Sequence, residues 1–500
     1  MSAPTKVARQ GLYNFLAIAS TSAAGILSTA LIAHHLTPDR MGYYTLVVWI
    51  SAMVGMLANL GYVTTTMKAM AEALGRKDLR ESAGVLAFSH HRVLRMGLLT
   101  TLAMAIAAPL LARACHHPEL AVALLVGSLG ILPAALYALY TAACQALEAY
   151  GHVAWITALT SSAMMGGIWL VLARHGSLAA LLAVTGLAMA LGAGVAFLVL
   201  SRWLQGWWRV ELAPDKRIEL RNFQWPVFVM LVLDSIVWQR SEVFFLGAYA
   251  PAHDVAFYGM AYSLSSMAMK LVPGTLIGLL IPKMSRAVGS GDGEGLGELF
   301  EKSCRYMAML ALPVAVGGAL LARPIVHLLY GSAYDPVAGL MGALLVANAL
   351  VMIYGFPTSS ILYSANGQKQ LVRIGLVVSA LNLLLAWILI PRFGAWGAVG
   401  ANSLAQLSSL VPGLIVAKRR TGAQAPVRLV LQVLVAAVLM GIPVWGIVHL
   451  GSPVLALALG PLVGLVAFGA LIYALGLIGV EDRLVLQAIA RRFPTFQRRG

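Results

Sequence analysis

Apolar residues along this chain form one bilayer-length run after another, from near its beginning to about residue 477. A hydrocarbon core is about 30 Å thick, and a helix of about 20 apolar residues crosses it. The runs lack the alternation of membrane strands, and backbone groups in lipid must pair within their own segment, so the pattern predicts α-helices. We predict fourteen spans, at roughly 12–33, 42–67, 84–112, 119–143, 153–173, 178–201, 224–250, 255–282, 303–322, 336–364, 371–391, 395–417, 427–449 and 453–477.

The composition agrees with an all-α polytopic membrane protein. Hydrophobic residues make up 60% of the 500 residues, charged residues make up 11%, and the mean hydropathy is +0.83. Soluble domains are far more polar. The first run is too long for a signal-peptide core, so we expect it to remain as an anchor. Cys115, Cys144 and Cys304 lie far apart and form no CxxC pattern, which favours a packing role over a disulfide or zinc site.

The net charge of +16 raises the possibility of a nucleic-acid partner, but its distribution predicts membrane orientation instead. With the N-terminus in the cytoplasm, 28 of the 35 Lys and Arg residues fall in cytoplasmic segments and five fall on the opposite side. This asymmetry follows the positive-inside rule and predicts that both termini are cytoplasmic. The basic tail RRFPTFQRRG can contact anionic lipid head groups, although orientation alone also explains it.

The two halves of the chain resemble each other. LIAHHLTPDRMGYYTLVVW is echoed by FFLGAYAPAHDVAFYGMAYSL about 214 residues later, and each contains a short Pro turn followed by an aromatic pair. A second similarity, at an offset of about 218 residues, links the region after Gln145 to the region after Tyr363. We predict two parallel six-helix lobes, 1–210 and 211–420, followed by two further helices and a basic cytoplasmic tail in 421–500. Shared membrane composition is the alternative explanation, whereas parallel repeats with substrate between them are a recurrent transporter plan.

The predicted seventh span contains the unusual stretch DSIVWQRSEVFFLG, with Asp234, Arg240 and Glu242 inside an apolar run. Ionised side chains inside a bilayer are costly, so such residues face an internal cavity or one another. At 1.5 Å per residue, Asp234 lies at a depth similar to that of Lys270 on the eighth span, which predicts an ion pair. On a continuous helix, Asp234 and Glu242 project about 80° apart, so that one wall holds both acids with Arg240 at its margin.

The stretch from Ala365 to Asn402 resembles the polysaccharide-type transporters, the Wzx-like flippases of the multidrug/oligosaccharidyl-lipid/polysaccharide (MOP) superfamily. The matching features are Gly367-Gln368-Lys369, Asn382, and Ile390-Pro391 followed by Gly394, Gly397 and Ala398. Pro391 and the two glycines also predict that one helix ends there and the next returns within four residues. The region LTPDRMGYYTLV with LANLGYVTTTMKAMAEALGRKD is similar to the first two helices of that family. Many relatives carry an acid where this chain has Asn59, so one charged site of the family is absent here.

The resemblance covers about 480 residues and implies two lobes that rock around a central cavity. It also implies a lipid-linked saccharide, usually on undecaprenyl pyrophosphate, as the cargo. On that basis Arg240 and Lys270 are candidates to bind the pyrophosphate or acidic sugars, because guanidinium and ammonium groups suit phosphate oxygens. Asp234 or Glu242 is the candidate carrier of a coupling proton. The alternative is a fixed salt-bridge cluster that joins the seventh and eighth spans.

Other polar residues are weaker candidates. Arg92 and Arg95 start the third span at the cytoplasmic mouth and could attract a pyrophosphate, or they serve only as a positive-inside flank. Asn14 and Asn59, like Asn348 and Asn382, line the cavity or bond across helices. Three His-His pairs lack a completing acid or thiol cluster, and GSGDGEGLGE matches no nucleotide loop, so no metal site and no cofactor is predicted.

The sequence therefore predicts a non-enzymatic flippase of the bacterial inner membrane. It would move an undecaprenyl-linked oligosaccharide outward for exopolysaccharide, O-antigen or capsule assembly, as a monomer among membrane lipids, with a polysaccharide polymerase and a chain-length regulator as pathway partners. An ion-coupled multidrug (MATE-like) exporter is the alternative, but it predicts a net acidic cavity. A peptidoglycan-precursor flippase is a further alternative. A saccharide-polymerising membrane enzyme is disfavoured because every predicted outside loop is short.

Overall fold

The chain is helical wherever its structure is described. The computed structural model describes residues 20–114, 120–238, 240–271, 284, 293–364, 367–422, 424–449 and 451–477. Every regular element in these ranges is a helix, and ten of the helices are long and apolar enough to cross a bilayer. These findings confirm the predicted all-α polytopic membrane fold. Each predicted apolar run contains a helix, while the count of fourteen spans stays a prediction.

The helices pack as two compact units. The first unit comprises Met1–Met260, Leu329–Ala333 and Ser379–Asn402, and the second comprises Ala261–Leu328, Tyr334–Val378 and Ser403–Gly500. This division follows packing, so it does not test the predicted repeat lobes 1–210, 211–420 and 421–500, which stay a prediction.

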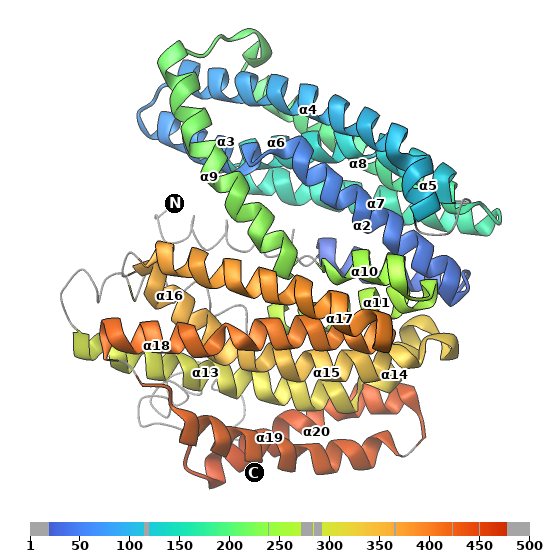
Figure 1. Ribbon diagram of the computed structural model, residues 1–500, viewed down its shortest axis with the longest axis vertical. Coiled ribbons are helices and arrows are strands. Elements are labelled where there is room, and N and C mark those ends of the chain that lie inside the picture. Colours follow the sequence, from blue (N-terminus) through green and yellow to red (C-terminus); the bar gives the residue numbers. More distant parts are fainter. Residues whose placement is uncertain are drawn as a thin grey trace, which may run out of the picture. The chain divides into compact units, whose positions relative to one another are not determined.

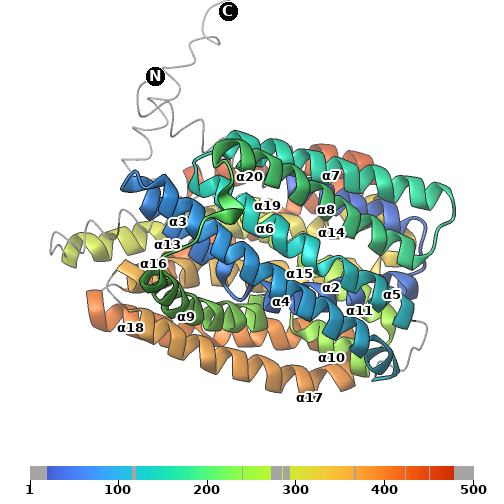
Figure 2. The same ribbon diagram turned by 90° about the horizontal axis from the view of Figure 1, so that it is seen from above.

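The first unit contains the N-terminal helices. Figures 1 and 2 show α4, α6 and α8 running side by side in it. After an apolar helix at Ser20–Ala33, its helices are α2 (Pro38–Asn59), α3 (Tyr62–Gly75), α4 (Leu79–Ala114), α5 (Leu120–Leu129), α6 (Ile131–Ala146), α7 (Tyr150–Ala173), α8 (Leu178–Trp203), the 3₁₀ turn η1 (Trp207–Arg209), α9 (Pro214–Trp238), α10 (Glu242–Tyr249) and the first half of α11 (Ala252–Leu271).

The second unit is built around α13, which packs between α15 and α19 (Figure 1). Phe300 and Cys304 of α13 are buried with Ile361 in its core. Its elements are the end of α11, α13 (Gly293–Leu320), most of α14 (Ala322–Tyr330), the last residue of η3 (Ser332–Tyr334), α15 (Pro336–Leu350), the π-helix η4 (Val351–Gly355), α16 (Phe356–Ser364), α18 (Leu410–Thr421), α19 (Val427–Val448) and α20 (Pro453–Ala474). The long α17 (Gln368–Ser408) contributes to both units.

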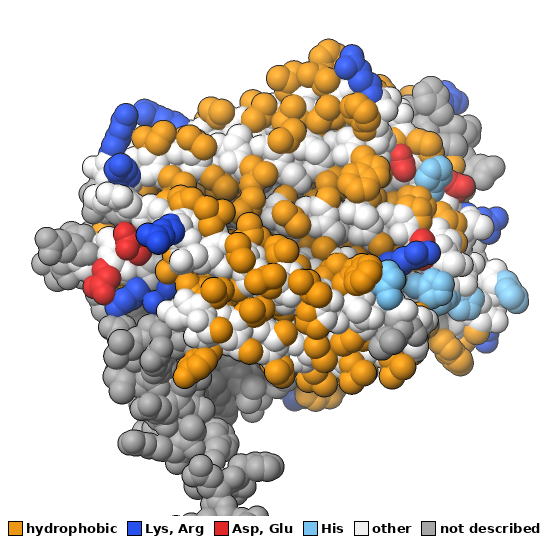
Figure 3. All heavy atoms as spheres, turned by 90° about the horizontal axis from the view of Figure 1, so that it is seen from below, with side chains coloured by type: hydrophobic (Ala, Val, Ile, Leu, Met, Phe, Trp, Pro, Cys, Tyr) orange, Lys and Arg blue, Asp and Glu red, His pale blue; other side chains and the backbone are white. Residues whose placement is uncertain are grey.

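The distribution of surface side chains suits a bilayer. On the face drawn in Figure 3, hydrophobic side chains fill the middle, whereas charged and His side chains gather at its two ends. Many large apolar side chains are exposed, including Leu102, Trp169, Leu187 and Leu465. In water such a surface would aggregate, so this exposure indicates contact with lipid.

Several predicted spans are not single α-helices. The second span breaks between α2 and α3, where Leu60 and Gly61 have φ values of 45° and 78°. The seventh breaks between α9 and α10, where Arg240 has a φ of 61°. The fourth divides at Gly130, and the tenth contains the π-helical turn Val351–Gly355. A positive φ turns the chain out of the right-handed helix, so the breaks at Leu60–Gly61 and at Arg240 place polar backbone groups inside the predicted spans.

The turn predicted after Pro391 is present inside α17. Gly394 has φ 52° and ψ −129°, a conformation open to glycine, and the chain reverses there. A Cβ on Gly394 would collide with the Asp254 carboxylate, and one on Gly397 would collide with the backbone of Leu389. The Asp254 Oδ2 accepts a hydrogen bond from the Ala395 N–H at 3.2 Å. Both glycines therefore let the two arms of α17 and the start of α11 approach closely.

The two turns that the repeat relates meet each other. The Asp39 carboxylate accepts a hydrogen bond from the His253 N–H at 3.2 Å and contacts the ring Nδ1 at 3.0 Å. These residues stand 214 residues apart, which is the offset of the repeat. At Gly42 the backbone of α2 touches that of Ala252, where any side chain would clash. This contact seats α10 and α11 against α2.

Candidate functional site

The break in the seventh span determines where its charged residues lie. Trp238 ends α9, Glu242 begins α10, and Arg240 between them adopts the left-handed conformation. A residue with a side chain in that conformation costs about 1–3 kcal/mol and persists only where the surroundings enforce it. The angle of about 80° between Asp234 and Glu242 was calculated for a continuous helix. That angle was wrong, because the two residues belong to different helices.

The Glu242 carboxylate is fully buried and holds three hydrogen bonds. Its Oε1 accepts from Asn382 Nδ2 at 2.7 Å and from Asn402 Nδ2 at 2.9 Å. Its Oε2 accepts from the Tyr258 hydroxyl at 2.9 Å. The exposed fraction of Glu242 is 0%. We call Glu242, Tyr258, Asn382 and Asn402 the Glu242 cluster.

Three separate segments assemble the Glu242 cluster. Tyr258 comes from α11, while Asn382 and Asn402 lie on opposite arms of α17, before and after Gly394. The two amides reach one carboxylate oxygen because the chain reverses at Gly394. The Ser241 hydroxyl donates to Asn382 Oδ1 at 3.0 Å, which orients the amide so that Nδ2 faces Glu242.

The electrostatics of the Glu242 cluster are unusual. Within the described part of the chain, every recorded side-chain partner of Glu242 is neutral. A buried carboxylate without a cationic partner depends on hydrogen-bond donors for its stability. The same oxygen that accepts from Tyr258 could carry a proton if the phenol hydrogen turned away, since a hydroxyl both donates and accepts. The arrangement can therefore hold the carboxyl group in either protonation state without moving a heavy atom.

The other charged candidates of the seventh and eighth spans are only partly described. Arg240 is half-buried, and its Nη1 donates to the Gly259 carbonyl at 3.3 Å. Lys270 is exposed in the last described turn of α11 and belongs to the second unit. The Asp234 side chain lies outside the described residues. The predicted ion pair of Asp234 with Lys270 thus stays a prediction.

The arginines of the third span lie on α4. Arg92 is half-buried with its guanidinium 5.4 Å from the centre of the Phe88 ring, and Arg95 is exposed. His90 instead faces inward, where its Nδ1 is 3.0 Å from the Tyr140 hydroxyl. No group of three His, Cys, Asp or Glu side chains suitable for a metal was found among the described residues, and His116–His117 fall outside them.

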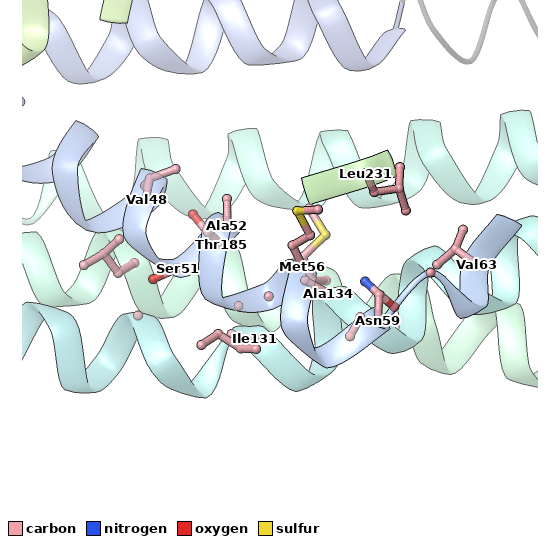
Figure 4. Close-up of a pocket in the computed structure, with 18 of the residues that line it drawn as sticks. Val48, Ser51, Ala52, Met56, Asn59, Val63, Ile131, Ala134, Thr185 and Leu231 are labelled. Carbon is pink, nitrogen blue, oxygen red and sulfur yellow. The ribbon is translucent and has the colours of Figure 1, made fainter. Parts of the chain in front are cut away.

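The first unit also contains a cavity of about 470 Å³ beside the α2–α3 break (Figure 4). Of the candidate residues it receives only Asn59, and Asn14 lies outside the described residues. None of the described side chains that line it is charged. They are Val48, Ser51, Ala52, Gly55, Met56, Asn59, Gly61, Val63, Thr64, Gly127, Gly130, Ile131, Ala134, Ala135, Leu182, Thr185, Gly186, Met189 and Leu231.

The described candidate residues lie at separate places. Glu242 is enclosed by neutral donors, Asn59 borders the cavity, and Arg92 and Arg95 lie on α4. Sequence reasoning listed Asn382 without a partner and missed Asn402 and Tyr258. A signal existed for both: Asn402 ends the stretch that carries the family resemblance, and Tyr258 belongs to the repeated aromatic pair.

The chain is similar to known proteins in sequence and in fold. A family model described as "Polysaccharide biosynthesis protein" matches residues 31–339. The Lipid II flippase MurJ of Bacillus subtilis (strain 168) is 29% identical over 240 residues, which cover 45% of this chain and 44% of that protein. The match thus spans less than half of this relative's length.

Two solved structures share the fold. The Lipid II flippase MurJ in an inward closed conformation superposes with a TM-score of 0.74 at 14% identity, covering 93% of this chain and 99% of that one. An inward-facing multidrug resistance MATE family transporter of the MOP superfamily superposes with a TM-score of 0.66 at 15% identity, covering 82% and 99%.

We predict that Asn402→Leu destabilises the protein, because it leaves a buried carboxylate with one donor fewer. The free energy of unfolding should fall by about 1–3 kcal/mol. The thermal unfolding midpoint of the purified protein measures this change. Asn222→Leu, at an exposed position on α9, is the matched control and should leave the midpoint nearly unchanged. Equal midpoints for Asn402→Leu and wild type would show that the bond contributes little.

Proposed function

The chain belongs to the polysaccharide biosynthesis protein family, and we propose that it is a flippase for an undecaprenyl-pyrophosphate-linked oligosaccharide. It would move this lipid from the inner to the outer leaflet of the bacterial inner membrane, for exopolysaccharide, O-antigen or capsule assembly. The family match over residues 31–339 is the observation that carries the proposal. The fold shared with a lipid flippase agrees with it.

The alternative is an ion-coupled multidrug exporter, since a MATE family transporter shares the fold. A cation exporter needs acidic groups in its cavity, because a desolvated cation requires a compensating charge. Among the described residues no acid lines the cavity of the first unit, and the acid of the Glu242 cluster is enclosed by donors. The family match also concerns polysaccharide biosynthesis. These observations favour the lipid-linked saccharide.

Transport would proceed by alternating access of the two predicted lobes, with both termini in the cytoplasm. Arg240, Lys270, Arg92 and Arg95 are our candidates to bind the pyrophosphate or acidic sugars. Cations attract phosphate oxygens strongly where water is scarce. A polysaccharide polymerase and a chain-length regulator would receive the product. No chemical step is required of the protein, so we expect transport without catalysis.

Glu242 is our candidate for the coupling proton, with Asp234 as the second. In the charged state its carboxylate would accept from Tyr258 and both amides. In the neutral state the proton on Oε2 would be donated to the Tyr258 oxygen, whose own hydrogen turns to another acceptor. The amides can only donate through Nδ2, so Oε1 would remain their acceptor throughout. Opening of the α17 hairpin around the cluster would then expose the carboxyl group to one side of the membrane.

Depletion of the protein tests the function directly. We expect undecaprenyl-pyrophosphate oligosaccharide to accumulate while surface polysaccharide is lost, because the substrate cannot leave the inner leaflet. Lipid extraction with mass spectrometry measures the first effect and gives the mass of the sugar. Normal lipid intermediates together with new sensitivity to cationic drugs would instead establish the multidrug exporter.

The role of the cations is tested by Arg240→Ala and Lys270→Ala. Each should reduce transport at least tenfold at unchanged protein level, since a lost charge contact with phosphate costs about 1.5–3 kcal/mol. Recovery of surface polysaccharide in the depleted strain reports transport. Arg419→Ala, at an exposed position on α18, is the control. Full complementation by both variants would remove these two residues from the substrate site.

The coupling proton is tested by Glu242→Gln, which keeps the size of the side chain and removes its titration. Uptake by vesicles with an imposed pH gradient should respond to the gradient in wild type and lose that response in the variant. Glu72→Gln, at an exposed acid on α3, controls for loss of a negative charge. A variant that transports with the wild-type pH response would transfer the proton role to Asp234 or remove it.

A further inference from the structure

The cavity of the first unit lies along one face of α2. Val48, Ser51, Ala52, Met56 and Asn59 follow one another along that helix in Figure 4. From Val48 to Asn59 the helix rises about 16 Å. Spread over this length, the volume of 470 Å³ corresponds to a mean cross-section of about 30 Å². The cavity is therefore a slot, longer than it is wide.

The slot offers an apolar surface. None of the lining side chains that the structure describes is charged, and most of these residues are aliphatic, methionine or glycine. Two polar atoms of the lining residues, Ser51 Oγ and Asn59 Oδ1, are buried against the walls and have no hydrogen-bond partner. Because these atoms are already buried from water, an apolar occupant would remove no further water from them. The slot is therefore suited to hydrocarbon and unsuited to a pyrophosphate.

Glycines set the width of the slot. Gly130 and Gly186 bring the backbones of the α5–α6 junction and α8 into direct contact at one wall. At Gly55 the nearest atom to an added Cβ is a methyl carbon of Ile131, 4.0 Å away, so this glycine leaves a recess. Non-bonded carbons pack at about 3.5–4.0 Å, so the cross-section holds a hydrocarbon chain with methyl branches. Leu231 of α9 closes one side of it.

We propose that this slot binds a segment of the polyprenyl chain of the lipid-linked substrate. The inference rests on the proposed function, because that function supplies a polyprenyl lipid as the cargo. The uncharged apolar lining selects hydrocarbon over the head group, and the recess at Gly55 suits a methyl-branched chain better than a straight acyl chain. Ordinary phospholipid acyl chains are the competing occupant.

Filling the slot provides the test. Gly55→Leu adds three carbons beyond the Cβ into the cavity, and its Cβ meets no atom closer than 4.0 Å. Leucine also favours the helix over glycine, so the variant should fold. Gly166→Leu makes the same change on α7, at an exposed glycine that has no atom within 4 Å of an added Cβ and does not line the slot. Ala134→Leu fills the slot from α6 and replaces Gly55→Leu if that variant does not reach the membrane.

The experiment uses the full chain in lipid vesicles with two photoactivatable probes, a diazirine-bearing geranylgeraniol and a diazirine-bearing phosphatidylglycerol. Peptide mass spectrometry locates the adducts. We expect the geranylgeraniol probe to label peptides that contain Met56 and Met189, with unlabelled undecaprenyl phosphate as a competitor. Labelling should fall at least fivefold in Gly55→Leu and stay unchanged in Gly166→Leu.

Three outcomes would overturn the inference: equal or stronger labelling of these peptides by the phospholipid probe, no labelling by the prenol, or equal labelling of Gly55→Leu and wild type. The assay uses no head group and no transport. If the prenol probe does not label the slot but depletion still causes the lipid-linked oligosaccharide to accumulate, the inference fails and the proposed function stands. If depletion causes no accumulation, the proposed function fails, and the labelling result still decides whether the slot binds a polyprenyl chain.

Discussion

A carboxylate that is shielded from water needs hydrogen-bond donors, and the first unit supplies them to Glu242 from α11 and α17. Transfer of an ionised group out of water costs several kcal/mol even in real proteins, so an isolated buried Glu would be intolerable. Here Tyr258, Asn382 and Asn402 provide three hydrogen bonds. These partners come from α11 and from both arms of α17, so one side chain joins segments that lie up to 160 residues apart in the chain.

Helix breaks make this arrangement possible, but each break also leaves backbone groups without their helical hydrogen bonds. In a bilayer, backbone groups released at a break find no water and must be paired by the protein. At the α2–α3 break the Leu60 carbonyl accepts a hydrogen bond from the Gln224 side-chain amide of α9. At the α9–α10 break the Val243 N–H returns to the Arg240 carbonyl at 2.9 Å. These two breaks are thus each stabilised by hydrogen bonds, the first beside the slot and the second beside the Glu242 cluster.

The chemistry of the first unit is divided between these two places. The Glu242 cluster is buried and joins one carboxylate, the hydrogen-bond acceptor, to three donors. The slot is mostly apolar, and none of its described lining residues is charged. The two places require different surroundings, because a buried carboxylate needs hydrogen-bond donors whereas an apolar cavity does not. A single site on one wall of the seventh span therefore does not account for both the slot and the Glu242 cluster.

The sequence by itself determined the membrane-spanning helices, the turn at Gly394 and the paired Pro turns near Asp39 and His253. These features depend on local properties, namely the length of apolar runs and the conformations open to Gly and Pro. Asn382 and the charged residues were visible as unusual positions, yet their partners were not. Only the tertiary structure decided that Glu242 meets Asn402, that the span breaks at Arg240, and that a slot follows α2. A helix wheel assumes an unbroken helix, and contacts between residues far apart in the chain depend on how the helices pack.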